Sequence, residues 1–169
     1  GQMVITEVFS NNIGNKDPDL DWFEIYLPGT VSSFELNGIS IFKEADGEHN
    51  SPPPHARCLH PQPPNSHVLC RNSDPLENGG IENCIPYSNM SLLVDEGYLA
   101  LGYASTGLII DEVPSYGLVS DGVSASLDAT FTNSFDNDNL DHWCDTPAEF
   151  TFGTLGALGT PNAVNPVCQ

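Results

Sequence analysis

Short runs of alternating apolar and polar residues recur along the chain and predict β-strands. In residues 3–9 the side chains alternate from Val4 onward with the two-residue period of an extended strand. The same reasoning predicts strands at about 3–9, 22–27, 38–43, 91–94, 97–103, 107–113 and 123–128. Turn pairs such as Asn37-Gly38 and Asp121-Gly122 separate the runs, and no window has the apolar stripe and caps of a helix. The pattern predicts an all-β sandwich or barrel.

The run Trp22–Tyr26 raises a question of burial. Because neighbouring side chains in a strand point to opposite faces, we expect only one of Trp22 and Phe23 to be fully buried. Glu24 shares the face of Trp22, and an inward carboxylate would need a paired donor. Since unpaired charges are seldom buried, we expect Glu24 at the surface.

Residues 44–90 interrupt this pattern with a stretch rich in proline, cysteine and histidine. Pro52-Pro53-Pro54 and the prolines that follow exclude most of it from a central strand, so a long loop is predicted, with one short edge strand at 67–70. Prolines and disulfides would pre-order such a loop and lower the entropic cost of binding. The predicted binding surface therefore lies here, at His55, His60, His67 and Tyr87.

Composition narrows the classes of protein. The chain has 169 residues, enough for one domain, and 39% are apolar, which argues against disorder. It carries 4 Lys and Arg against 23 Asp and Glu, for a formal net charge of −19, which disfavours nucleic-acid binding. No apolar run is long enough to span a bilayer, so no direct membrane insertion is expected.

Five cysteines, Cys58, Cys70, Cys84, Cys144 and Cys168, favour disulfides in an oxidising compartment. A Cys58–Cys70 closure would staple the 44–90 stretch and leave Cys84 over, although spacing does not fix connectivity. A reduced protein with buried thiols is the alternative. A second alternative is a zinc site, since histidines and cysteines intermingle at 55–84, but the spacing matches no standard finger.

Two acidic stretches could bind calcium, which prefers six to eight oxygen ligands. The first offers Asp136, Asp138 and Asp141, with Asn133 or Asn137 as further ligands, and the second offers Asp17, Asp19 and Asp21. Neither matches an EF-hand loop, and solvated acidic loops are the alternative. Loops from the two ends of a sandwich can meet, so the two stretches could also form one site.

Catalytic motifs are missing from the sequence. It contains no Gly-x-Ser-x-Gly elbow, no His-Glu-x-x-His and no Gly-rich phosphate loop, so we expect no enzymatic activity.

Seven segments in order resemble the lamin tail domain family. They are the strand ending Thr6-Glu7-Val8, the Asp–Trp–Phe–Glu–Ile–Tyr run at 21–26, the segments 34–41, 95–102, 109–113 and 122–127, and the Gly–Thr–Pro–Asn–Ala–Val–Asn ending at 159–165. The resemblance covers most of the chain outside 44–90. Leu27 stands where the family usually has Asn, and Asn162 replaces a Gly.

The resemblance implies one domain over 1–169, an immunoglobulin-like β-sandwich of about seven to nine strands that carries 44–90 as an insertion. Cys144 and Cys168 flank the terminal motif and look like the disulfide of the bacterial, exported variety. We then expect a non-catalytic adhesion, scaffolding or ligand-binding module, monomeric in isolation. It would belong to a larger exported or cell-envelope protein, lie outside the cell or in its envelope, and meet a protein or glycan at the cell surface.

A calcium-dependent carbohydrate-binding or hydrolase accessory module is the alternative function. It predicts bound calcium in the acidic loops and exposed aromatic side chains such as Trp143, Tyr87 or Tyr98 beside them.

Overall fold

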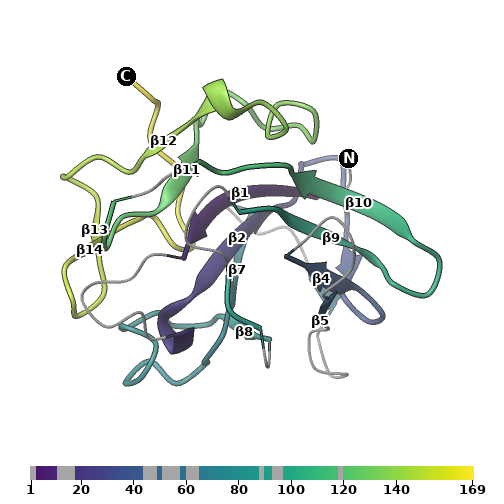
Figure 1. Cartoon of the computed structure of the whole chain (residues 1–169), viewed down its shortest axis with the longest axis horizontal. Helices are drawn as coiled ribbons and strands as arrows, with labels where there is room; N and C mark the ends of the chain where they lie inside the picture. The colour runs from purple at the N-terminus through teal and green to yellow at the C-terminus, as the bar shows by residue number, and fades with distance from the viewer. Residues whose placement is uncertain are drawn as a thin grey trace.

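A computed structural model describes residues 3–10, 18–43, 49–50, 58–59, 65–87, 90–92, 97–117 and 120–169. The described residues form an all-β fold built on two main sheets, as predicted (Figure 1). Their helical turns are two short 3-10 turns, η1 (Pro18–Leu20) and η2 (Leu140–His142).

The larger sheet has six strands in the order β12-β11-β1-β2-β7-β8. Their bounds are β1 (Val4–Phe9), β2 (Trp22–Tyr26), β7 (Ser66–Cys70), β8 (Ile85–Pro86), β11 (Ala125–Leu127) and β12 (Trp143–Asp145). Neighbouring strands are antiparallel except β7 and β8, which are parallel. The sheet therefore joins strands from both ends of the chain around β1.

The smaller sheet has four strands in the order β10-β9-β4-β5, and two short ladders accompany the main sheets. The bounds of its strands are β4 (Ser40–Phe42), β5 (His49–Asn50), β9 (Leu99–Tyr103) and β10 (Leu108–Val113). The ladders pair β3 (Phe34–Glu35) with β6 (Cys58–Leu59) and β13 (Thr151–Phe152) with β14 (Ala157–Leu158). Five predicted strands are confirmed within a few residues as β1, β2, β9, β10 and β11, and the 38–43 strand as β4. Of the strand predicted at 91–94, residues 93–94 lie outside the described residues, and residues 91–92 are not in a strand.

The main core lies between the two sheets, which makes the fold a β-sandwich. Ile5, Phe23 and Leu69 of the larger sheet belong to the same buried cluster as Ile41 and Leu101 of the smaller one. These side chains are fully buried, and the burial of their apolar surface is the main driving force for packing the sheets together.

A second, smaller core covers the other face of the larger sheet. Phe9 and Trp22 stack with ring centroids 5.7 Å apart, and Phe152 of β13 packs edge-on against both rings. Trp22 and Phe23 are therefore both fully buried, and the expectation that only one would be is wrong. The expectation failed because the β13–β14 hairpin, from the far end of the chain, covers the face that the strand pattern leaves open (Figure 1).

The predicted insertion contributes to the larger sheet. The short strand expected at 67–70 is present as β7, but it lies between β2 and β8 rather than at an edge. All five residues of β7 pair with β2, from Trp22↔Cys70 to Tyr26↔Ser66. Residues 65–87 are thus part of the fold.

Two disulfides each join a strand of the larger sheet to a neighbouring segment of the chain. Cys70 at the end of β7 bonds Cys84 ahead of β8, and Cys144 of β12 bonds Cys168 near the chain end; the Cα atoms are 5.8 Å apart in both pairs. The Cys144–Cys168 expectation is confirmed. The Cys58–Cys70 expectation is wrong, because Cys84 lies next to Cys70 through the parallel β7–β8 pairing. Disulfides of this kind are typical of proteins in oxidising compartments.

Candidate functional site

Glu7 and Glu24 face each other across β1 and β2, and both are buried. They are register partners in the antiparallel ladder, with 0% and 1% of their surface exposed. A register shift between Ile5 and Glu7 turns Glu7 toward the face that carries Glu24. The expectation of a surface position for Glu24 is wrong, because its carboxylate finds the donors that burial requires.

Glu7 is surrounded by hydroxyl and amide donors. Ser124 Oγ donates to its Oε1 at 2.5 Å, and Ser126 Oγ donates to the same atom at 3.3 Å. Thr160 donates twice, from its backbone N to Oε1 and from its hydroxyl to Oε2, both at 2.9 Å. These four donors come from β11 with its preceding residue and from the C-terminal segment, so Glu7 ties three parts of the chain together.

Glu24 has a similar set of neutral donors. Thr6 Oγ1 donates to Oε1 at 3.3 Å, the backbone N of Asn162 donates to Oε2 at 2.7 Å, and the Ser66 side chain also hydrogen-bonds the carboxylate. Strands β1, β2 and β7 therefore position the Glu24 carboxyl group, and the C-terminal segment covers it.

Burial sets the protonation of this pair. Desolvation raises the pKa of Glu7, although the hydrogen bonds from Ser124 and Thr160 oppose the shift. Desolvation raises the pKa of Glu24 well above its usual value, and the nearby charge of Glu7 raises it further. The pair accordingly holds protons more tightly than two exposed glutamates would.

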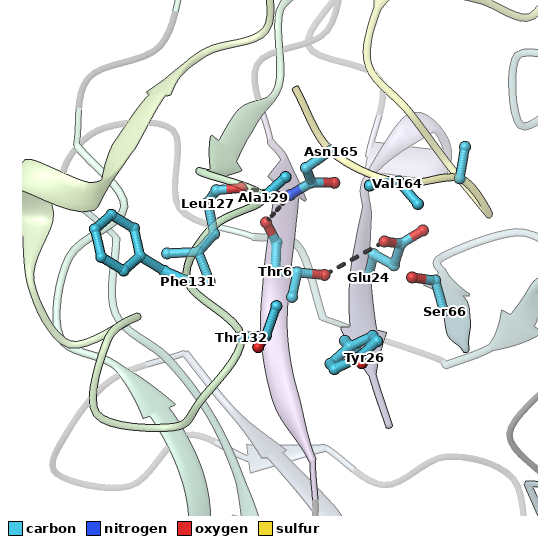
Figure 2. A pocket seen from close by; sticks show the side chains of 11 residues that line it. Thr6, Glu24, Tyr26, Ser66, Leu127, Ala129, Phe131, Thr132, Val164 and Asn165 are labelled. Atoms are coloured by element: carbon cyan, nitrogen blue, oxygen red, sulfur yellow. Dashed lines mark hydrogen bonds between the residues drawn. The ribbon is translucent and has the colours of Figure 1, made fainter. Parts of the chain in front are cut away.

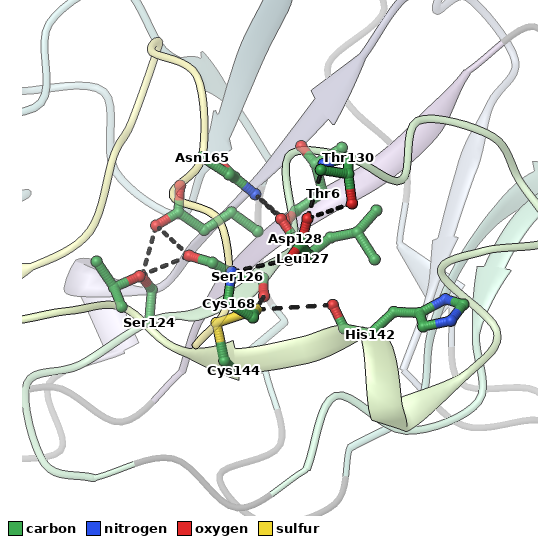
Figure 3. The surroundings of a disulfide bond; sticks show 12 residues. Thr6, Ser124, Ser126, Leu127, Asp128, Thr130, His142, Cys144, Asn165 and Cys168 are labelled. Atoms are coloured by element: carbon green, nitrogen blue, oxygen red, sulfur yellow. Dashed lines mark hydrogen bonds between the residues drawn. A yellow bond between two sulfur atoms is a disulfide. The ribbon is translucent and has the colours of Figure 1, made fainter.

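The C-terminal segment from Gly159 to Cys168 covers these carboxyl groups and is attached to the strands by hydrogen bonds. Asn165 Nδ2 donates to the carbonyls of Thr6 and Leu127, and the Cys168 N–H donates to Asp128 Oδ2 next to the Cys144–Cys168 bond (Figure 3). Asn162 adopts a φ of 61°, a left-handed conformation that Gly and Asn tolerate best. An Asn at this position therefore serves the turn as a Gly would.

A pocket opens beside Glu24 with a volume of about 220 Å³, and we name it the Glu24 pocket. Its polar lining residues are Thr6, Glu24, Ser66, Thr132 and Asn165. Its aromatic and aliphatic lining residues are Tyr26, Phe131, Leu127, Ala129, Ala163 and Val164. Figure 2 shows Glu24 between Thr6 and Ser66, with Tyr26 beside them and Val164 and Asn165 on the C-terminal segment.

The Glu24 pocket is buried at its base and exposed at its rim. Glu24 and Leu127 are each 1% exposed, whereas Val164 is 65% exposed. Phe131 stacks on His142, with ring centroids 3.7 Å apart, which fixes that ring beside the pocket. A few polar groups among apolar and aromatic walls are the usual composition of a ligand site.

Another hollow, of about 420 Å³, is lined by Gly80, Glu82, Asn83 and Asn162 among others. Although it is larger, its ionisable lining residue, Glu82, is exposed, and it contains no buried ionisable side chain among its lining residues. We therefore place the candidate site at the Glu24 pocket.

The predicted binding surface in 44–90 is only partly within the described residues. His55 and His60 lie outside them, and His67 is half-buried within β7, paired with Ile25. Tyr87 is 1% exposed and packs against Phe23, so its assignment to a binding surface is wrong. Trp143 is also buried, with its Nε1 donating to the carbonyl of Asn137, so it is not an exposed aromatic of the kind the carbohydrate alternative predicts.

The described residues of the two acidic stretches range from buried to exposed. Asp17 lies outside the described residues, Asp19 is half-buried in η1, and Asp21 is buried and accepts the N–H of Leu92 at 2.9 Å. Asp138 and Asp141 are exposed and Asp136 is half-buried. No group of three or more His, Cys, Asp or Glu side chains with metal-site geometry occurs among the residues that the structure describes, and calcium binding stays a prediction.

Within the second stretch, Asn137 points inward while its acidic neighbours do not. Its Nδ2 donates to the carbonyl of Ile5 and to Asp111 Oδ2, and it is fully buried. Desolvation raises the pKa of Asp111 to about 7, against hydrogen bonds from Ile5 N and Asn137. The loop is therefore anchored onto β1 and β10 by its amide residue.

The disulfide pairing also excludes two of the cysteines that the zinc hypothesis offered as metal ligands. Cys70 and Cys84 are bonded to each other and offer no thiolate to a metal. The Cys58 side chain lies outside the described part of the chain.

Sequence reasoning missed most of the Glu24 pocket, in particular Ser66, Phe131 and Asn165, and it also missed the neighbouring Glu7. One signal was available: Ser124 and Ser126 alternate with apolar residues, as Glu24 does with Phe23 and Ile25, which marks one polar face on each strand. What covers that face could not be inferred, because Thr160 lies 153 residues from Glu7.

Comparison with family models, curated proteins and solved structures returned no match. Among the described residues, no helix is both long and apolar enough to cross a bilayer.

Proposed function

We propose that this chain is a non-catalytic extracellular binding module, an immunoglobulin-like domain of lamin tail type within a larger exported or cell-envelope protein. The observation that carries the proposal is the Glu24 pocket, which combines a buried carboxyl group, two aromatic side chains and an exposed rim. The partner is a protein or a glycan at the cell surface, and the isolated module is a monomer.

Several features support an extracellular setting. The two disulfides favour an oxidising compartment, and each one fixes a segment of the larger sheet that borders the candidate site. The order of the strand motifs along the chain and the left-handed Asn162 agree with the lamin tail resemblance.

The site favours binding over catalysis. Ser124 and Ser126 are fully buried and hydrogen-bond Glu7 and Thr146, so their hydroxyls have no open path to a substrate. Nucleophilic catalysis would instead require a hydroxyl group that a substrate can reach.

The test is a binding screen by ¹H–¹⁵N NMR with small amines, methyl glycosides and carboxylates, at about 150 mM salt to screen non-specific attraction. The proposal predicts that one class shifts the amide signals of Ser66, Thr132 and Asn165 in a saturable way. It also predicts that Phe131→Ala weakens this binding, whereas Phe135→Ala, which changes an 81% exposed ring outside the pocket, does not. Shifts spread evenly over the surface, with none at these amides, would refute the pocket as the site.

A further inference from the structure

The buried glutamate pair has no described cationic partner, although the whole chain is strongly acidic. Of the four Lys and Arg residues, the structure describes Lys43 and Arg71, and neither is among the principal causes of the pKa shift of Glu7 or Glu24. Arg71 Nη1 donates to Ser91, and Lys43 follows β4 in the other sheet. A buried ionised carboxylate is costly unless a cation or several donors compensate it. The donors described for the pair are neutral, so a cation that approaches these carboxyl groups would add a favourable charge interaction.

The Glu24 pocket suits one side chain rather than a chain of sugars. Its volume of about 220 Å³ is below the range of roughly 300–1,000 Å³ usual for sites that enclose drug-sized ligands. Leu127 and Ala129 provide an apolar wall for an aliphatic stem, and Glu24 with Ser66 provides acceptors at the base. Tyr26 and Phe131 add ring faces of the kind that attract cations.

We propose that the Glu24 pocket receives a lysine side chain from a basic partner protein. The stem lies along Leu127 and Ala129, and the ammonium group reaches Glu24 and the hydroxyls of Thr6 and Ser66. The net charge of −19 attracts such a partner over longer distances and raises its association rate. This inference rests on the proposed binding role of the pocket.

The test is an NMR titration of the whole chain with Nα-acetyl-lysine methylamide at about 150 mM salt. The matched probe is Nα-acetyl-norleucine methylamide, which has the same aliphatic stem without the ammonium group. We expect the lysine probe to shift the amides of Ser66, Thr132 and Asn165 and to bind at least about tenfold more tightly than norleucine, since hydrogen bonds to charged groups are stronger than neutral ones.

Variants test the role of the carboxyl group. Glu24→Gln should weaken lysine binding about tenfold and leave norleucine binding unchanged, because it removes the charge and keeps the shape. Glu82→Gln is the matched control, an exposed carboxylate that lines the other hollow, and it should change neither affinity. The comparison of the two probes on the unaltered chain needs no variant and remains informative if Glu24→Gln does not fold.

The outcomes separate this inference from the proposed function. Methyl glucoside serves as a third probe. Equal affinity for the lysine and norleucine probes, or tighter binding of methyl glucoside at the same amides, would overturn the lysine inference and leave the pocket as a binding site. No shift at these amides with any of the three probes would overturn both.

Discussion

Glu7 of β1 and Glu24 of β2 are cross-strand partners whose carboxyl groups are both buried beneath the C-terminal segment. Their donors are serine and threonine hydroxyls and the backbone N–H groups of Thr160 and Asn162. A polar layer thus lies on one face of a sheet whose other face is the apolar core. The Glu24 pocket and the attachment of the chain end both depend on this layer.

Glu24→Gln should stabilise the protein at alkaline pH relative to the unaltered chain. The folded pKa of Glu24 is raised, so the folded state holds its proton more tightly than the unfolded state, whose pKa is about 4.3. The contribution of this group is therefore fully present below about pH 4.3 and is lost as pH rises through the folded pKa. Urea denaturation at pH 5, 7 and 8.5 should show a smaller decline for Glu24→Gln, whereas Glu82→Gln should follow the unaltered chain. An identical decline in all three proteins would argue against a buried Glu24.

Thr160→Val should lower the free energy of unfolding by about 1–3 kcal/mol, because it removes the hydroxyl that donates to Glu7 Oε2 and leaves a buried acceptor with one donor fewer. The backbone bond from Thr160 N to Oε1 stays in place. Thr151→Val on β13 is the matched control, since Thr151 is exposed. Chemical denaturation measures both variants, and equal effects would show that the hydroxyl of Thr160 contributes nothing specific.

The disulfide pattern predicts two linked peptides in a non-reducing digest, one joining Cys70 to Cys84 and one joining Cys144 to Cys168. Replacing Cys144 and Cys168 together by Ser should lower the free energy of unfolding by about 3 kcal/mol, from the loop entropy returned to the unfolded chain. Cys58→Ser should leave both linked peptides unchanged. A Cys58–Cys70 peptide from the native protein would contradict the pairing.

Asn137→Asp should destabilise the protein by about 3 kcal/mol at pH 8, because it replaces a buried donor with a second carboxylate next to Asp111. The loss should be smaller at pH 5, since the pKa of Asp111 is about 7 and the group is neutral there. Asp141→Asn, at an exposed position of the same stretch, is the control and should have little effect. Thermal melting at the two pH values distinguishes an anchoring residue from a solvated loop residue.

The alternation of apolar residues was sufficient to predict the all-β class and the main strands, because each strand carries its own pattern. It could not predict how Val68 and Trp22 are covered, since the small core above them is completed by Phe152. Tyr87 was misplaced for a related reason: a proline-rich stretch suggested an exposed loop, yet parallel pairing with β7 at 85–86 brings Tyr87 against Phe23. Local patterns identify strands, whereas burial on the second face depends on contacts between distant segments.

The same limit explains the candidate site. Glu24 stood out within its strand, but its burial requires Asn162, which lies 138 residues away in the sequence. The calcium hypothesis centred on the acidic residues around 136–141 and named Asn137 as a further ligand. The structure instead turns Asn137 inward, where its amide donates to the carbonyl of Ile5.

The most direct test of this account is a ¹³C NMR titration of the side-chain carboxyl carbons of Glu7 and Glu24, assigned with Glu7→Gln and Glu24→Gln. The account predicts that both groups titrate above the ordinary glutamate pKa of about 4.3, with Glu24 shifted strongly upward, and that the lysine probe changes the Glu24 signal. Titration of both groups at or below about 4.3, with a Glu24 signal insensitive to the probe, would contradict it.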